Sequence, residues 1–234
     1  MAKLICLQSG HEGVTSGATG ALGEKELNVR IRNRLSEILI SKGFQLQLVN
    51  ANPTNAEINK DFDLFLALHG DANIYGTGVG CITAPDLNYD DNWNESNRIS
   101  KDIESLYFKE SGIVNHPERI NVNMTRYYMW SRLTSKTACV ILEMGVVQDA
   151  HDKVILADTD RVCNAIARGV CKAFSVPFDQ TAPIPPPEDW KAKYTAKNAE
   201  FEAYKKTSDK EIVDKANKII ELQEKIEKAK TALS

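Results

Sequence analysis

The sequence has 234 residues, of which 42% are hydrophobic and 26% are charged, and its formal net charge is −3. These proportions are ordinary for a globular protein and argue against the collagen-like, disordered and membrane classes. Because the charges show no basic excess, we expect no nucleic acid partner. No apolar run approaches the length of a membrane span, so we expect no membrane insertion.

The first residues and the cysteines both bear on the compartment. Residues 1–13 contain one Lys and a short apolar run, which is too short for the apolar region of a secretory signal. The five cysteines are scattered without CxxC pairing, which indicates neither a zinc finger nor a disulfide scaffold. We therefore expect reduced thiols and synthesis in the cytoplasm without a signal peptide.

Strand-like and helix-like segments alternate over residues 1–178. Apolar or alternating runs predict strands, and apolar residues at helical spacing predict helices. The predicted elements are, in chain order, strand 4–8, helix 24–40, strand 44–49, strand 63–69, helix 100–109, strand 138–143 and helix 160–174. This alternation predicts an α/β fold with a twisted mixed, mostly parallel sheet flanked by helices.

The composition changes beyond residue 178. Residues 179–187 hold four of the eight prolines, which predicts an extended linker. Residues 188–234 contain no Gly or Pro and are rich in Ala, Lys and Glu, and apolar residues recur every seven positions from Ile212 to Leu233. This pattern predicts a C-terminal α-helical appendage, either a hairpin or coiled-coil-like. The predicted organisation is a main domain over 1–178, a linker over 179–187 and a helical tail over 188–234.

Three predicted strands lead to side chains that can bind or activate a metal ion. His11 follows the first strand, His69 and Glu143 end two others, and Glu24 begins the first helix. Functional groups of open α/β sheets gather beyond the carboxyl ends of the strands. Two His and one carboxylate form a catalytic zinc set, and a further carboxylate can accept a proton. The residues alone leave other roles open, because each His could be a loop residue and Glu24 could serve only the helix dipole.

The sequence around these residues resembles the zinc-dependent N-acetylmuramoyl-L-alanine amidases of phage endolysins and bacterial autolysins. Four family motifs occur in order, as SGHEG at 9–13, EKELN at 24–28, DLFLALH at 63–69 and ILEMG at 141–145. The resemblance covers residues 3–175, so 1–178 would be the catalytic domain. It implies that His11, Glu24 and His69 bind one Zn²⁺ per chain and that Glu143 is the catalytic residue.

The sequence departs from the family pattern at Glu12, at residues 71–73 and at residues 146–148, and two further histidines lie outside the pattern. Glu12 replaces the usual Gly, and we expect a solvated side chain there. His116 and His151 match no ligand position, and we expect both at the surface.

The resemblance implies hydrolysis of the amide between N-acetylmuramic acid and L-alanine in peptidoglycan. Together with the lack of a signal peptide, it predicts a phage endolysin, made in the host cytoplasm and acting on the cell wall after release. Two alternatives stay open: another zinc amide hydrolase such as a peptidoglycan carboxypeptidase, and a non-catalytic wall-binding or assembly protein. We expect residues 188–234 to pack on the domain, to self-associate or to contact the wall.

Overall fold

The computed structural model describes residues 2–13, 23–71, 80–87 and 92–179. Within them, five strands form one sheet in the order β2-β1-β3-β5-β4. Neighbouring strands are parallel except that the edge strand β4 runs antiparallel to β5. The strand bounds are β1 (Leu4–Ser9), β2 (Gln45–Val49), β3 (Leu64–Asp71), β4 (Cys81–Thr83) and β5 (Cys139–Val146). The predicted mixed, mostly parallel sheet is confirmed.

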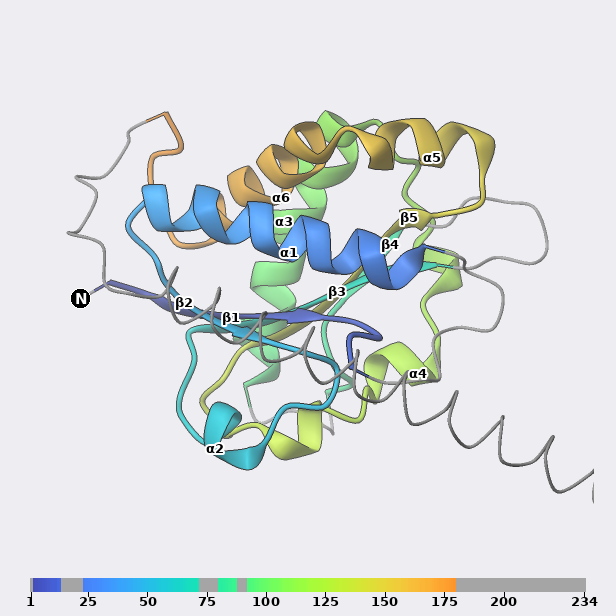
Figure 1. Ribbon diagram of the computed structural model, residues 1–234. Helices are drawn as coiled ribbons and strands as arrows, with labels where there is room; N and C mark the ends of the chain where they lie inside the picture. The colour runs from blue at the N-terminus through green and yellow to red at the C-terminus, as the bar shows by residue number, and fades with distance from the viewer. Residues whose placement is uncertain (1, 14–22, 72–79, 88–91, 180–234) are drawn as a thin grey trace, which may run out of the picture. The chain divides into compact units, whose positions relative to one another are not determined.

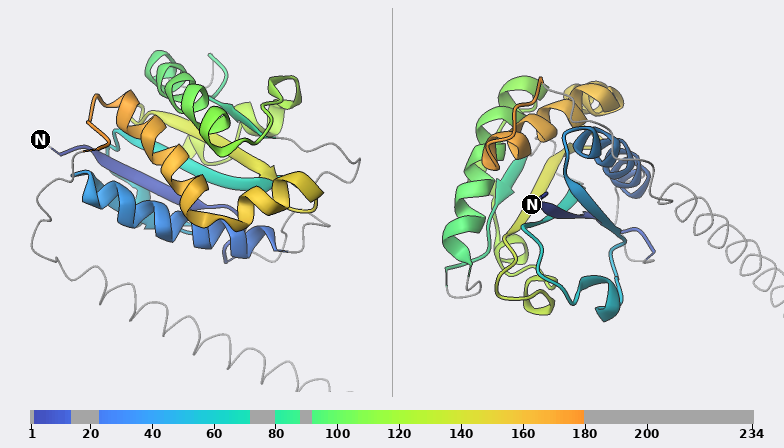
Figure 2. Two further views of the ribbon diagram at one scale, coloured as in Figure 1. Left: turned by 90° about the horizontal axis from the view of Figure 1, so that it is seen from above. Right: turned by 90° about the vertical axis from the view of Figure 1, so that its left-hand side faces the viewer.

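Helices cover both faces of this sheet (Figure 1). One face carries the longer helices, which are α1 (Glu24–Ser41), α3 (Trp93–Ser111), α5 (Ala150–Ala157) and α6 (Thr159–Ala173). The other face carries α2 (Asn55–Ile58) and α4 (Val122–Thr125). Two 3₁₀ turns lie at Pro117–Arg119 and Trp130–Arg132. Figure 2 shows the two layers from above and from one end.

The two layers arise because side chains alternate along the buried strands. On β3, Leu64, Leu66 and Leu68 pack into the core beneath the longer helices, while Phe65 and Ala67 pack into the core on the opposite face. His69 continues the second series, so the same alternation that builds the cores directs this side chain toward the face of α2 and α4.

Every strand and helix predicted over residues 1–178 occurs in the structure, and most of their ends shift by at most three residues. The largest shift is in α3, which begins at Trp93 rather than residue 100, because its first turns are polar and show no apolar period. The elements β4, α2, α4 and α5 were not predicted. Three of them have only three or four residues, which is too short for a period to be recognised.

The predicted linker 179–187 and tail 188–234 lie outside the described residues, apart from Asp179. Among the helices that the structure describes, none is both long enough and apolar enough to cross a membrane.

The cysteines provide a first prediction. All five are buried thiols outside any disulfide, and burial raises the pKa of Cys81 and Cys163 to about 12 and that of Cys171 to about 11. A thiolate forms only as the pH approaches the raised pKa, so we expect iodoacetamide at about pH 8 to leave the native protein unlabelled and active. Mass spectrometry counts the labels, with denatured protein as the control. Inactivation that follows labelling would instead indicate an essential thiol.

Candidate functional site

Three of the four predicted site residues meet at the carboxyl end of the sheet. His11 lies in the turn after β1, His69 lies near the end of β3, and Glu24 is the first residue of α1. Oε1 of Glu24 lies 3.1 Å from Nε2 of His11 and 3.6 Å from Nδ1 of His69. Their side chains are close enough together to hold one metal ion.

Close backbone packing explains why His69 reaches this position. The amide of Gly10 donates to the carbonyl oxygen of Leu68 at 2.9 Å, which extends the β1–β3 pairing beyond the end of β1. The imidazole of His69 lies directly against Gly10, where an added Cβ would come within 2.5 Å of the ring. Only glycine leaves room for the ring at this point.

The turn that follows brings His11 toward the first helix. His11 itself has a positive φ of 62°, a conformation that is unfavourable for a residue other than glycine. The buried side chain of Asn28 connects this turn to α1, since its Nδ2 donates to the carbonyl oxygen of Gly10 at 3.1 Å and lies 3.4 Å from Oε1 of Glu24. Asn28 thus ties the start of the turn to the helix that carries Glu24.

The electrostatics of this cluster suit a cation. Burial would raise the pKa of Glu24, but the hydrogen bonds from His11 and His69 outweigh it and hold the pKa at about 2, so Glu24 is a carboxylate. Burial lowers the pKa of His69, which favours the neutral imidazole. Oε2 of Glu24 is buried and has no hydrogen-bond partner. A buried carboxylate oxygen without a partner, beside two imidazoles, fits a bound metal ion.

Glu143 lies on the neighbouring strand β5. The β3–β5 register pairs it with His69, and the β4–β5 register pairs it with Cys81. Paired residues of adjacent strands point to the same face, so the Glu143 side chain projects beside His69. Burial raises its pKa well above the usual value, and the charges of Glu24 and Asp71 add to this effect. A carboxyl group whose pKa is raised beside a metal-binding cluster is suited to proton transfer.

The comparisons with known proteins agree with this arrangement. Residues 5–174 match the N-acetylmuramoyl-L-alanine amidase family, which is most of the chain. The chain belongs to this family. It is therefore an amidase, an enzyme whose family acts on peptidoglycan.

Solved structures of such enzymes share the fold. The amidase AmiC2 of Nostoc punctiforme has 20% identity and a TM-score of 0.55, with 74% of this chain and 97% of that chain covered. The catalytic domain of CwlV from Bacillus (Paenibacillus) polymyxa var. colistinus has 18% identity and a TM-score of 0.57, with 75% of this chain and 99% of that chain covered. The Clostridioides difficile amidase CwlD was solved in complex with the GerS lipoprotein. It has 19% identity and a TM-score of 0.58, with 74% of this chain and 98% of that chain covered. No curated protein matches the chain.

The other histidines of the amidase lie apart from the cluster. His151 is exposed as expected, whereas His116 is half-buried and pairs with Glu118 at 2.8 Å. His151 lies beside Asp149 and Asp152 in a second group of possible ligands. Hydrogen bonding accounts for that group, since Asp149 caps the N-terminus of α5 and Asp152 accepts from the amide of Val146 at 3.0 Å.

The expectation of a solvated Glu12 is wrong. Its carboxylate forms an ion pair with Arg32, a buried residue of α1, and lies 3.4 Å from Nη2 of that residue. Nη1 of Arg32 also donates to the carbonyl oxygen of Val49 at 3.1 Å. A buried guanidinium needs a counter-charge. Glu12 supplies this charge from the turn that carries His11, which ties the turn to α1.

This pair gives a second prediction. Glu12→Gln leaves the Arg32 charge buried without a carboxylate, so we expect the free energy of unfolding to fall by about 2 kcal/mol. This loss is smaller than that for breaking a wholly buried ion pair, because Glu12 is partly exposed. Urea denaturation measures the change. The matched control is Glu37→Gln, whose partner Arg34 is exposed, where the loss should stay below about 1 kcal/mol. Equal effects would show that the Glu12 pair is no more than a surface contact.

Two further residues at the cluster, Gln8 and Tyr127, escaped the sequence analysis. The hydroxyl of Tyr127 lies 3.3 Å from Nε2 of His69 and donates to Oε1 of Gln8 at 3.0 Å. Gln8 is a polar residue at the end of an apolar run, which is the one signal that could have indicated it. Tyr127 lies in an irregular segment with no periodic pattern, so nothing in the sequence marks it.

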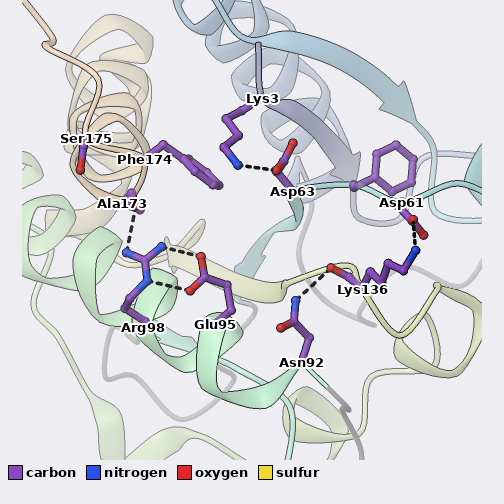
Figure 3. A pocket seen from close by; sticks show the side chains of 11 residues that line it. Lys3, Asp61, Asp63, Asn92, Glu95, Arg98, Lys136, Ala173, Phe174 and Ser175 are labelled. Atoms are coloured by element: carbon purple, nitrogen blue, oxygen red, sulfur yellow. Dashed lines mark hydrogen bonds and ion pairs between the residues drawn. The ribbon is translucent and has the colours of Figure 1, made fainter. Parts of the chain in front are cut away.

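A polar hollow of about 600 Å³ lies at the other end of the sheet (Figure 3). It borders the amino ends of β1 and β3, whereas the cluster lies at the carboxyl ends. The charged groups that line it are already paired, as Lys3–Asp63, Lys136–Asp61 and Arg98–Glu95. This hollow is separate from the candidate site of the amidase.

Proposed function

We propose that this amidase depends on Zn²⁺ and cleaves the amide between the lactyl group of N-acetylmuramic acid and L-alanine. The observation that carries the proposal is the convergence of His11, Glu24 and His69, together with the second oxygen of Glu24, Oε2, which is buried and has no hydrogen-bond partner. Two His and one Glu leave a fourth position open for water, which is typical of catalytic zinc. Glu143, on the adjacent strand, supplies the carboxylate that such chemistry needs.

In this mechanism His11, Glu24 and His69 would hold the ion. When bound, zinc supplies positive charge for the carbonyl oxygen of the substrate and acidifies a water molecule. Glu143 accepts a proton from a water molecule as the oxygen of that water adds to the carbonyl carbon of the substrate. It then donates the proton to the amide nitrogen as the C–N bond breaks. The products are the lactyl carboxylic acid and the free amine of L-alanine.

Digestion of purified peptidoglycan tests this proposal. We expect the purified protein to contain about one Zn²⁺ per chain and to release whole stem peptides from intact glycan, and we expect a chelator to stop the release. A carboxypeptidase would instead release single terminal amino acids. A non-catalytic wall-binding protein would release nothing, and a decayed site would contain no metal.

We further propose that the chain acts as a phage endolysin, made in the host cytoplasm and active on the wall after release. This proposal rests on the sequence motifs that the chain shares with the amidases of phage endolysins and bacterial autolysins. Cytoplasmic expression in a bacterium tests the role. We expect lysis only when the membrane is opened by a co-expressed holin, and none with Glu143→Gln. Lysis without membrane opening would contradict it.

A third prediction concerns residues 188–234, for which we propose self-association or wall contact. Phe178 packs under Lys42 and Arg168, whose charged groups lie 4.5 and 4.1 Å from its ring centroid, so a chain that ends at Phe178 retains this contact. We expect such a chain to stay folded and to hydrolyse soluble muropeptides normally, but to clear suspended cell walls severalfold more slowly. Turbidity measures clearing, and light scattering reports self-association. Unchanged clearing would exclude a targeting role.

A further inference from the structure

A series of polar groups leads away from His69 on the side opposite the metal cluster. Nδ1 of His69 faces Glu24 at 3.6 Å, whereas its Nε2 lies 3.3 Å from the hydroxyl of Tyr127. That hydroxyl donates to Oε1 of Gln8 at 3.0 Å, and Nε2 of Gln8 donates to the carbonyl oxygen of Asn50 at 3.3 Å. Gln8 is fully buried and Tyr127 is half-buried.

The carbonyl group of Asn50 sets the direction of these hydrogen bonds. A carbonyl oxygen only accepts, so Gln8 turns its NH₂ group toward Asn50 and its oxygen toward Tyr127. Tyr127 has a single hydroxyl hydrogen, which it donates to Gln8. Its oxygen therefore has only lone pairs to offer His69, and Nε2 of His69 carries a hydrogen.

We propose that Tyr127 is a positioning residue that keeps a hydrogen on Nε2 of His69 and leaves Nδ1 as the metal-binding atom. The inference rests on the proposed zinc function. An imidazole nitrogen that carries a hydrogen cannot bind a metal ion, so the acceptor at one nitrogen decides which atom is the ligand.

The packing of the rings supports this role. The imidazole of His69 and the phenol of Tyr127 meet edge to face, with centroids 5.5 Å apart. Gly10 lies against the same imidazole. The ring is thus held in the orientation that directs Nε2 to Tyr127 and Nδ1 to Glu24. Loss of an outer hydrogen-bond partner of a ligating histidine typically lowers metal affinity about 10–100-fold.

Zinc affinity tests the proposal on the full-length protein. Competition with a chromophoric chelator gives the dissociation constant of the wild type and of Tyr127→Phe, which keeps the ring and removes the hydroxyl. We expect the constant to rise about 10–100-fold. The matched control is Tyr128→Phe, because that hydroxyl donates to the carbonyl oxygen of Ala51 and not to His69. It also lies 3.5 Å from Nε2 of Gln8, but Gln8 keeps Asn50 as its acceptor when that hydroxyl is removed. Tyr128→Phe should change the constant by less than about twofold, well below the effect of a lost outer partner.

A second variant tests the same series from its other end. Gln8→Met keeps the length of the side chain but removes the acceptor for Tyr127, whose hydroxyl can then donate to Nε2 of His69. This favours the wrong tautomer, so we expect zinc affinity to fall here as well. In the zinc-loaded wild type, ¹⁵N NMR of the imidazoles should show the hydrogen of His69 on Nε2, with His116→Gln and His151→Gln used for assignment.

Three results would overturn the inference alone: zinc affinity unchanged in both Tyr127→Phe and Gln8→Met, equal losses in Tyr127→Phe and Tyr128→Phe, or the His69 hydrogen on Nδ1 in the loaded protein. A wild type that binds no zinc would overturn the proposed function itself, and the inference with it. Unfolding of the chelator-treated variants separates a loss of fold from a loss of affinity. If Tyr127→Phe does not fold, Gln8→Met and the NMR result decide.

Discussion

Replacement of His69 by Ala should remove the metal from the protein and abolish measurable amide hydrolysis. His69 supplies one of the three ligands, and its loss leaves His11 and Glu24 with too few donors for a closed tetrahedral set. The loss of zinc affinity should exceed the approximately 10–100-fold effect of an outer hydrogen-bond partner. Metal analysis of the purified variant gives the occupancy, and release of stem peptides from sacculi gives the activity.

Thermal unfolding provides an independent measurement of the same ligand. Zinc that binds only the folded state stabilises it, by about 2.7 kcal/mol when the free ion is at 100 times its dissociation constant. A chelator should therefore lower the Tm of the wild type but not that of His69→Ala. His151→Ala is the control, because its side chain is 61% exposed and lies outside the cluster. Full metal occupancy in both His11→Ala and His69→Ala would show that the ligand assignment is wrong.

Glu143→Gln should separate metal binding from proton transfer. The amide has nearly the same shape as the carboxyl group but cannot accept a proton from water, so we expect the hydrolysis rate to fall at least about 100-fold. Zinc content and Tm should stay close to those of the wild type, because Glu143 is not one of the three ligands. The comparison is made on soluble muropeptides, which do not depend on wall binding.

The stability of this variant is informative in its own right. Burial and the neighbouring charges raise the pKa of Glu143, so the carboxylate opposes folding above its ordinary pKa in the metal-free protein. Replacement by the neutral Gln should remove that cost, and chelator-treated Glu143→Gln should be at least as stable as the wild type at neutral pH. Near wild-type turnover in the zinc-loaded variant would show that another group takes the proton.

The sequence indicates the ligands because each one is placed by a local pattern. The apolar runs that end at His69 and Glu143 are strands in the structure, and the helix predicted to begin at Glu24 does begin there. Strand ends of a parallel sheet share one edge, so the general position of the site follows from chain order and the α/β pattern. The sequence does not fix which strands are neighbours. The pairing of His69 with Glu143 depends on β3 and β5 being adjacent, and their sequence separation gives no sign of this.

The contacts that support the ligands are beyond prediction for a different reason. The partner of Glu12 is Arg32, a charged helix residue whose sequence position does not indicate that it is buried. The packing of α1 buries it. Tyr127 comes from an irregular segment and meets His69 across 58 residues of sequence. Such contacts depend on tertiary packing between loops, whose course no periodic pattern determines.

The contact between Gly10 and His69 also bears on the entropy of metal binding. A histidine on an open loop samples several rotamers, and ordering a side chain on binding costs about 0.5–1.5 kcal/mol. Here the ring of His69 packs directly against Gly10 at the end of the neighbouring strand, in the space that a Cβ would otherwise fill. The rotamer is therefore selected when the sheet forms, and an arriving ion need not select it again. Metal-free protein should accordingly regain its ion without refolding, so that the enzyme can be emptied and reloaded as a folded molecule.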